Sequence, residues 1–216
     1  MSAIGIEELT RAAGAHELAS GKIVVDLGCG SGGIGLWLAL RTGATLVGVD
    51  FSAIAIANAK RLAEDLGLSE RARFVVEDFT KTRLPDESAD AVISVDALMF
   101  CDAACAVREI ARLLKPGGRA AVVAAEAITE DAPAILPRDY RSVFEDAGLR
   151  VLEHAVLDKY RERLLRLYRA LNARQHELRE QGGIGAESLL AESQKWLERE
   201  HLPPRAREIL ITATLG

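Results

Sequence analysis

Residues 23–35 read I-V-V-D-L-G-C-G-S-G-G-I-G, and this stretch decides the fold of the chain. The β-branched run at residues 23–25 is typical of a short strand buried on both faces of a parallel sheet. The glycines that follow, at positions 28, 30, 32 and 33, have no Cβ and tolerate positive φ, so the backbone can turn sharply and a ligand can approach it closely. The apolar spacing of residues 34–40 then predicts a helix whose first N–H groups point at that ligand.

The glycines alone do not identify the ligand. The pattern Gly28-x-Gly30-x-x-Gly33 also matches the fingerprint of dinucleotide-binding enzymes. Asp26 decides between the alternatives, because a carboxylate two residues before the first glycine repels a pyrophosphate and attracts a cation. S-adenosylmethionine carries a sulfonium and an ammonium and no phosphate. The sequence D-L-G-C-G-S-G resembles the first motif of the class I S-adenosylmethionine-dependent methyltransferases.

Composition limits the other possibilities. The chain has 216 residues, of which 49% are hydrophobic, enough for one substantial core. A net charge of −5 argues against a nucleic-acid partner, whose phosphates need basic side chains. No apolar run approaches membrane-spanning length and no secretory leader is seen, so we expect a soluble cytoplasmic monomer or homodimer without a membrane partner. The three cysteines form no C-x-x-C pair, so no disulfide framework and no metal site are expected.

Strand and helix patterns alternate along the rest of the chain. A helix is expected over residues 4–19, and Ser52 and Asp102 are predicted to cap two further helices. Short spacings between the elements predict right-handed βαβ units and a doubly wound, mostly parallel α/β sheet of seven strands. The six strands expected after the first cover residues 44–49, 73–76, 91–95, 120–125, 149–157 and 208–215.

An acidic residue closes each of the first five strands. In parallel sheets, ligands bind at the carboxyl ends of the strands, so we expect these side chains to surround the ligand. They are Asp26, Asp50, Asp78, Asp96 and Glu126.

The resemblance to the methyltransferases covers residues 20–155 and implies roles at the cofactor. The acid that closes the second strand, here Asp50, binds both ribose hydroxyls in that family, and the next residue, Phe51, lies against the adenine. Glu77-Asp78-Phe79 resembles the third motif, in which Asp78 accepts from the adenine amino group and Phe79 offers an apolar wall. The remaining cofactor contacts implied are Asp26, Gly28, Gly30, Gly32 and Val95.

The end of the fourth strand bears on the substrate class. Residues 95–100 read V-D-A-L-M-F and lack the Asn-or-Asp-Pro-Pro-aromatic motif that holds planar amino groups in that family. This argues against nucleic-acid bases and protein amides as acceptors. The apolar residues 98–100 either line a small-molecule site or pack under the following helix.

About fifty residues without a strand pattern separate the last two strands, where a tight hairpin is usual. Tyr160, Leu164, Leu167 and Leu171 mark one face of a long helix that Gly182-Gly183 is expected to end, and a second helix follows. In the methyltransferase topology this insertion lies at the carboxyl edge. We therefore divide the chain into an α/β core, residues 1–157 and 207–216, and a helical lid, residues 158–206.

The basic stripe on the first lid helix has two interpretations. Lys159, Arg163 and Arg166 form either an ordinary solvated face or an electropositive mouth for an anionic acceptor.

The resemblance implies transfer of a methyl group from S-adenosylmethionine to an O, N or C atom of a small molecule, leaving S-adenosylhomocysteine. Asp96 and His154 are the candidates for a general base. A nicotinamide-dependent oxidoreductase and a non-catalytic S-adenosylmethionine-binding module are the alternatives. The candidates for acceptor contacts are Phe100, Glu126, Tyr160, Arg163 and Tyr168.

Overall fold

The computed structural model describes residues 3–5, 8–10 and 18–216 and, at residues 181–185, the backbone only. Most of the helix expected over residues 4–19 lies outside the described residues. The strands are β1 (Ile23–Leu27), β2 (Thr45–Asp50), β3 (Ala72–Val76), β4 (Ala89–Val95), β5 (Leu114–Ala127), β6 (Leu149–Val156) and β7 (Ala206–Leu215). The helices are α2 (Gly33–Thr42), α3 (Ala53–Asp65), the 3-10 turn η1 (Leu98–Phe100), α4 (Ala103–Leu113), α5 (Tyr140–Asp146), α6 (Tyr160–Ala173) and α7 (Gln175–Glu198).

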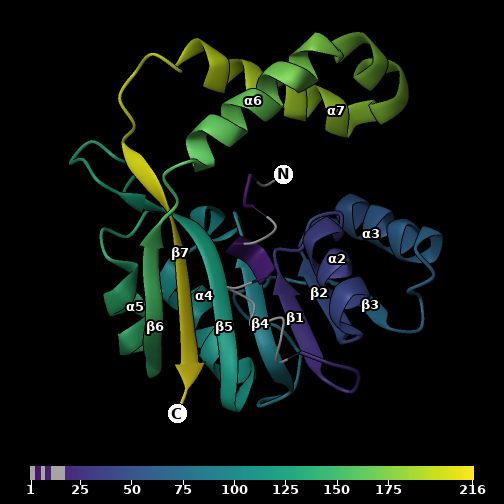
Figure 1. Ribbon diagram of the computed structural model, residues 1–216, viewed down its shortest axis with the longest axis vertical. Helices are drawn as coiled ribbons and strands as arrows, with labels where there is room; N and C mark the ends of the chain where they lie inside the picture. Colours follow the sequence, from purple (N-terminus) through teal and green to yellow (C-terminus); the bar gives the residue numbers. More distant parts are fainter. Residues whose placement is uncertain (1–2, 6–7, 11–17) are drawn as a thin grey trace.

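The seven strands form one sheet in the order β3-β2-β1-β4-β5-β7-β6 (Figure 1). Neighbours from β3 through to β5 pair in parallel, and β7 runs antiparallel to both β5 and β6. The predicted seven-strand, mostly parallel sheet is confirmed. Because β7 is reversed, β6 ends and β7 begins at the edge where the parallel strands finish.

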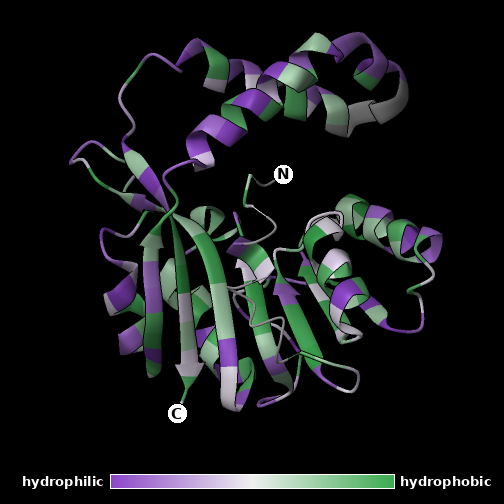
Figure 2. Ribbon diagram, viewed as in Figure 1, coloured by the Kyte–Doolittle hydropathy of each residue, from purple (hydrophilic) through white to green (hydrophobic). Residues whose placement is uncertain are grey.

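Helices cover both faces of the sheet. Leu36 of α2 and Ile56 of α3 pack with Phe74 of β3 on one face. On the other face, Ile110 of α4 and Phe144 of α5 join the apolar side chains of β4, β5 and β7. Figure 2 shows the strands as largely hydrophobic, as burial on two sides requires.

The predicted caps form. The Ser52 side chain accepts from the backbone N–H of Ala55 at the start of α3, and Asp102 accepts from Ala104 and Cys105 at the start of α4. Each cap satisfies N–H groups that a helix leaves unpaired in its first turn. The chain therefore leaves β2 and β4 in fixed directions at the carboxyl edge.

The insertion between β6 and β7 forms α6 and α7, which lie side by side beyond the carboxyl edge (Figure 1). The predicted break at Gly182-Gly183 is wrong, because α6 ends at Ala173 and the α7 backbone continues through both glycines. Packing against α6 outweighs the cost of about 1 kcal/mol for each glycine inside a helix. None of the described helices combines the length and apolar character needed to cross a membrane.

The buried face of α6 differs from the predicted stripe. Tyr160, Leu164, Leu165 and Tyr168 are buried, whereas Leu167 is only half-buried. Buried side chains of α6 share an apolar cluster with β1, β4, β5 and α2. The helix therefore packs against the core and also against α7.

Candidate functional site

The turn after β1 packs tightly against the protein at Gly28 and is open to a ligand at Gly30. Gly28 has φ +76°, and a Cβ there would lie 2.3 Å from the Ala97 Cβ, so a side chain cannot fit. Gly30 has φ +52°, yet no heavy atom lies within 4 Å of where its Cβ would be. Backbone N–H groups of Gly28 and Cys29 donate to the Val49 carbonyl at 2.8 and 3.0 Å. The turn is thus fixed to β2 and leaves space for a ligand above Gly30.

Asp50 lies beside this open space. Its Oδ2 accepts from the backbone N–H of Gly30 at 2.8 Å and its Oδ1 from that of Ser52 at 2.8 Å. Each carboxylate oxygen has a second lone pair, so an oriented acceptor remains for ligand hydroxyls. The neighbouring Phe51 is 71% exposed, which is unusual for so large an apolar side chain and suits a flat ligand ring.

Asp26 is buried below the turn, with 3% exposure, and its Oδ2 has no hydrogen-bond partner among the described residues. Burial raises the pKa of this carboxyl to about 7; the Gly35 N–H opposes the shift and the charge of Asp50 adds to it. A cationic ligand would compensate such a group. These three features fit the three parts of S-adenosylmethionine. Asp26 suits its cationic end, and the open space at Gly30 leaves room for its central part. Asp50 and Phe51 suit its ribose and its adenine.

The third-motif residues separate in the structure. Asp78 is exposed, and its Oδ1 accepts from Thr80 N–H and Oγ–H at 2.8 and 2.7 Å, which lowers its pKa. Phe79 is only 6% exposed and packs in the core below Gly28. Asp78 can therefore meet a ligand directly, whereas Phe79 supports the turn from beneath.

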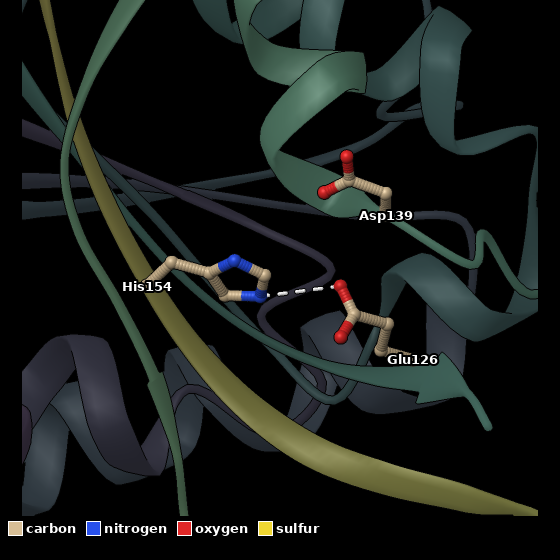
Figure 3. A group of neighbouring side chains, drawn as sticks. All are labelled: Glu126, Asp139 and His154. Carbon is tan, nitrogen blue, oxygen red and sulfur yellow. Dashed lines mark ion pairs between the residues drawn. The ribbon is translucent and has the colours of Figure 1, made fainter.

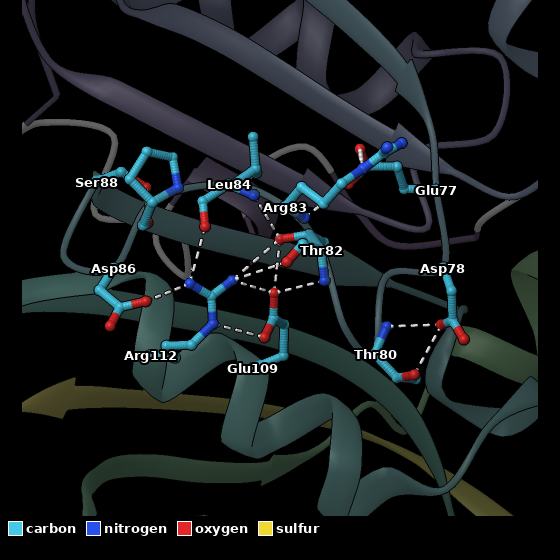
Figure 4. A network of polar contacts seen from close by, with 11 residues as sticks. Glu77, Asp78, Thr80, Thr82, Arg83, Leu84, Asp86, Ser88, Glu109 and Arg112 are labelled. Carbon is cyan, nitrogen blue, oxygen red and sulfur yellow. Dashed lines mark hydrogen bonds and ion pairs between the residues drawn. The ribbon is translucent and has the colours of Figure 1, made fainter.

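A polar network anchors the loop that carries Asp78 (Figure 4). Arg112 of α4 donates to the Leu84 carbonyl at 2.8 Å and to Glu109 at 2.6 and 2.9 Å. Glu109 in turn accepts from the Thr82 N–H and hydroxyl. Bidentate contacts of this kind are strong and directional, so they fix the loop after β3 against α4.

Asp96 and Tyr160 meet at the carboxyl edge of the sheet. Asp96 follows β4 with φ +57°, a conformation rarely adopted by residues other than glycine, and its N–H donates to Val123 O at 3.0 Å. The Tyr160 hydroxyl, at the start of α6, donates to Asp96 Oδ2. Val95 is half-buried at the end of β4, and Phe100 is 74% exposed in η1.

Glu208 also belongs to this region, and the sequence analysis missed it. Burial, with the Asp96 carboxylate adding, raises the pKa of Glu208 to about 7. Its Oε2 is buried and has no hydrogen-bond partner among the described residues. Its position offered one usable signal, because an antiparallel last strand begins at the ligand edge.

His154 and Glu126 lie elsewhere (Figure 3). His154 Nε2 is 3.1 Å from Glu126 Oε1, and Arg207 holds Glu126 Oε2 with two donors at 2.6 and 2.9 Å. A register shift in β6 places His154 opposite Ile211, whose face packs on α4 and α5. Without that bulge it would face the side of Tyr160. The structure therefore does not bring His154 to Asp96, and Glu126 is not presented to an acceptor.

Glu126, Asp139 and His154 place ligand-type atoms within 4.8 Å of one another, as a metal site requires. Both Glu126 oxygens already accept hydrogen bonds, one of them from the cationic Arg207. Asp139 caps α5 through Arg141 N–H and Ser142 Oγ. These donors make the group an ion-pair network that ties β5, β6 and β7 to α5.

Three of the four arginines of α6 contact carboxylates, whereas Arg161 donates to the backbone carbonyls of Glu200 and Leu202 at 3.0 Å. Arg163 lies 2.7 Å from Glu8, and Arg166 lies 2.7 Å from Glu162. Arg169 likewise contacts Glu200 at 2.5 Å. Their charge is compensated locally, which favours the interpretation as a structural, solvated face over an anion-binding mouth. The Tyr168 hydroxyl is also engaged, since it donates to Glu192 Oε1 at 2.6 Å.

Comparison with known proteins agrees with this site. Residues 25–122 match the family model described as a methyltransferase domain. The sterol 24-C-methyltransferase of Pneumocystis carinii is 37% identical over 99 residues, 45% of this chain and 26% of that protein. The chain matches between 26% and 38% of the length of its first curated relatives.

Solved structures show the same fold over nearly the whole chain. The structural alignment with the [4+2]-cyclase SpnF covers 97% of this chain and 79% of that protein, with a TM-score of 0.81 at 22% identity. The alignment with a geranyl diphosphate methyltransferase in complex with SAM covers 97% of this chain and 84% of that protein, with a TM-score of 0.70 at 20% identity. The α/β core of this chain is therefore similar to methyltransferase domains in sequence over residues 25–122, and to S-adenosylmethionine-dependent methyltransferases in fold.

Proposed function

We propose that this protein transfers the methyl group of S-adenosylmethionine to a small-molecule acceptor. The observation that carries the proposal is the open turn at Gly30, flanked by the oriented Asp50 and by the buried Asp26, whose Oδ2 accepts no hydrogen bond from the described residues. A pyrophosphate would meet two carboxylates here, which argues against a nicotinamide cofactor.

The residues around the turn have separate roles in holding the cofactor. Asp26 supplies negative charge for the methionine end, and the glycines at 28, 30 and 32 let the backbone approach the cofactor. Asp50 accepts from the ribose, Phe51 packs on the adenine, and Asp78 accepts from its amino group. Phe79 and Val95 support the site from the core. When bound, the cofactor supplies an electrophilic methyl group on a sulfonium, so the chain mainly has to align the acceptor and exclude water.

We assign residues 158–206 as a lid over the core formed by residues 1–157 and 207–216. The contact between Tyr160 of α6 and Asp96 after β4 supports this, because it joins the insertion to the acceptor side of the sheet edge. Phe100 and Tyr160 are the acceptor contacts that we retain. A cytoplasmic location, a monomeric or homodimeric state and the absence of a nucleic-acid partner stay predictions of the sequence.

Two measurements test the proposal. Calorimetry should detect binding of S-adenosylmethionine and S-adenosylhomocysteine, and binding of NAD in their place would contradict it. Methyl-labelled cofactor should label a metabolite extract and leave tRNA, DNA and bulk protein almost unlabelled. Efficient labelling of a macromolecule would refute the small-molecule assignment.

A non-catalytic or differently reacting cofactor-binding protein is the second candidate. It is favoured by the fold similarity to a protein described as a [4+2]-cyclase. Cofactor binding without label transfer to any fraction of the extract would support this candidate.

A further inference from the structure

We propose that the lid formed by residues 158–206 opens when Glu208, at its base, loses a proton. This inference rests on the assignment of the insertion as a lid, made above. It goes beyond that assignment because it names a residue of the core that controls the lid and the signal to which the lid responds.

Glu208 is bonded to the point where the chain enters the lid. β6 ends at Val156, and the next backbone N–H, that of Leu157, donates to the Glu208 carbonyl at 2.8 Å. The Tyr160 N–H then donates to the Leu157 carbonyl at 2.9 Å, and α6 begins. Two successive backbone hydrogen bonds therefore join Glu208 of β7 to the first residue of α6.

The Glu208 side chain lies on the face of the sheet that α6 covers. Side chains alternate along β7, so Ile209 packs with α4 and α5, whereas Leu210 joins the apolar cluster that contains Tyr160. β7 pairs with β5 without a register shift, and Glu208 therefore shares the face of Leu210. Its carboxyl group lies beneath the start of α6.

This position confines a carboxyl group without completing its hydrogen bonds. Glu208 Oε2 is buried and accepts no hydrogen bond from the described residues. A carboxylate loses more hydration free energy in such a place than a protonated carboxyl does. Coverage by α6 therefore favours the protonated form, and the protonated form in turn favours the closed lid.

Two titratable groups face Glu208 from the elements packed around it. Asp96 follows β4, and the Tyr160 hydroxyl donates to its Oδ2. Burial raises the pKa of Tyr160 above its usual value, so this hydroxyl stays neutral. The neighbour of Glu208 in β5 is the apolar Ala125.

The remaining polar groups near the start of β7 belong to the other face of the sheet. The Arg207 side chain and the Tyr140 backbone N–H both donate to the Glu126 carboxylate there. The proton on Glu208 is therefore controlled chiefly by coverage from α6.

The sign and size of the effect follow from the pKa of Glu208. Burial raises this pKa from 4.5 to about 7, and the charge of Asp96 adds to the shift. In the open lid the carboxyl is hydrated, so the closed lid binds the proton more tightly. The stabilisation of the closed lid is complete below pH 4.5 and is lost as pH rises through 7. The shift of 2.5 pH units (7 − 4.5) limits the increase in the ratio of open to closed lid to about 300-fold.

Hydrogen exchange of the unchanged full chain tests the response to pH. Protection factors, corrected for the intrinsic exchange rate at each pH, are compared for α6 and for the core helix α4 between pH 5.5 and 8.5. Protection of α6 should fall by about 10- to 30-fold relative to α4. The comparison with α4 separates lid opening from the effect of Asp26, whose pKa is also about 7 and which acts on the stability of the whole fold.

The other outcomes of this measurement overturn the inference in distinct ways. Equal protection of α6 and α4 at every pH would show that the insertion is not a lid. Weaker protection of α6 that does not vary with pH relative to α4 would leave the lid standing and remove the role of Glu208. Neither result bears on methyl transfer, because the measurement needs no cofactor or acceptor and the labelling experiment tests that function separately.

Substitutions then assign the response to one side chain. Glu208→Gln keeps the size of the side chain and removes its ionisation, so the protection of α6 relative to α4 should no longer vary with pH. Glu208→Ala should give the same loss of pH dependence. Glu198→Gln, at an exposed glutamate of the lid, is the matched control and should keep the full response. A response that persists in both Glu208 variants would refute the proposal.

Discussion

Replacing Asp26 with asparagine should stabilise the fold above neutral pH. Burial raises the pKa of Asp26 from 3.8 to about 7. The folded state therefore binds this proton more tightly than the unfolded chain, and the stabilisation, complete below pH 3.8, is lost as pH rises through 7. The interval of about 3.2 pH units (7 − 3.8), at about 1.4 kcal/mol per unit, gives an upper limit of about 4 kcal/mol. Asp26→Asn removes this cost.

Denaturant unfolding at several pH values between 4 and 8 measures this effect. The free energy of unfolding of Asp26→Asn minus that of the unchanged protein should increase between about pH 4 and 7 and then level off. Asp65→Asn, at an exposed aspartate of α3, should give a difference that does not vary with pH. A difference for Asp26→Asn that is independent of pH would refute the argument.

The same carboxyl links stability to cofactor binding. If the cationic end of S-adenosylmethionine lies near Asp26, binding lowers the pKa of Asp26 and releases a proton near pH 7. Calorimetry in two buffers with different ionisation enthalpies should detect this release in the unchanged protein and not in Asp26→Asn. Equal release from both proteins would place the cation elsewhere.

Four further substitutions test the rest of the site. Asp50→Asn should weaken cofactor binding by about 10- to 100-fold in calorimetry, since the ribose loses a charged acceptor; unchanged affinity would contradict that role. Gly28→Ala should fail to fold stably because its Cβ would lie 2.3 Å from Ala97, whereas Gly30→Ala should fold and lose the cofactor. Equal thermal stability of these two variants would show that the turn is not open above Gly30. Tyr160→Phe should lower the free energy of unfolding by about 1–3 kcal/mol, because Asp96 loses a buried donor, and an unaltered denaturation midpoint would argue against that contact.

Local patterns identified most of the core correctly. The apolar run before Asp26, the glycine turn and the caps at Ser52 and Asp102 act over a few residues, so their structures follow from spacing alone. The insertion was harder to predict, because glycine propensity suggested a break at residues 182–183. Packing of α7 on α6 overrode that preference.

The acidic residues show where sequence reasoning ends. Alternation of strands and helices determined that Asp26, Asp50 and Asp96 would share one edge of the sheet, because parallel strands finish together. Only the tertiary structure decided which face each later side chain occupies. One bulge in β6 turns His154 away from Asp96. The reversed β7 brings Glu208 close enough to Asp96 for the charge of Asp96 to raise the pKa of Glu208. The positions of His154 and Glu208 both depend on strand register. A register shift of one residue moves a side chain to the other face of the sheet, and no local pattern in the sequence reveals such a shift.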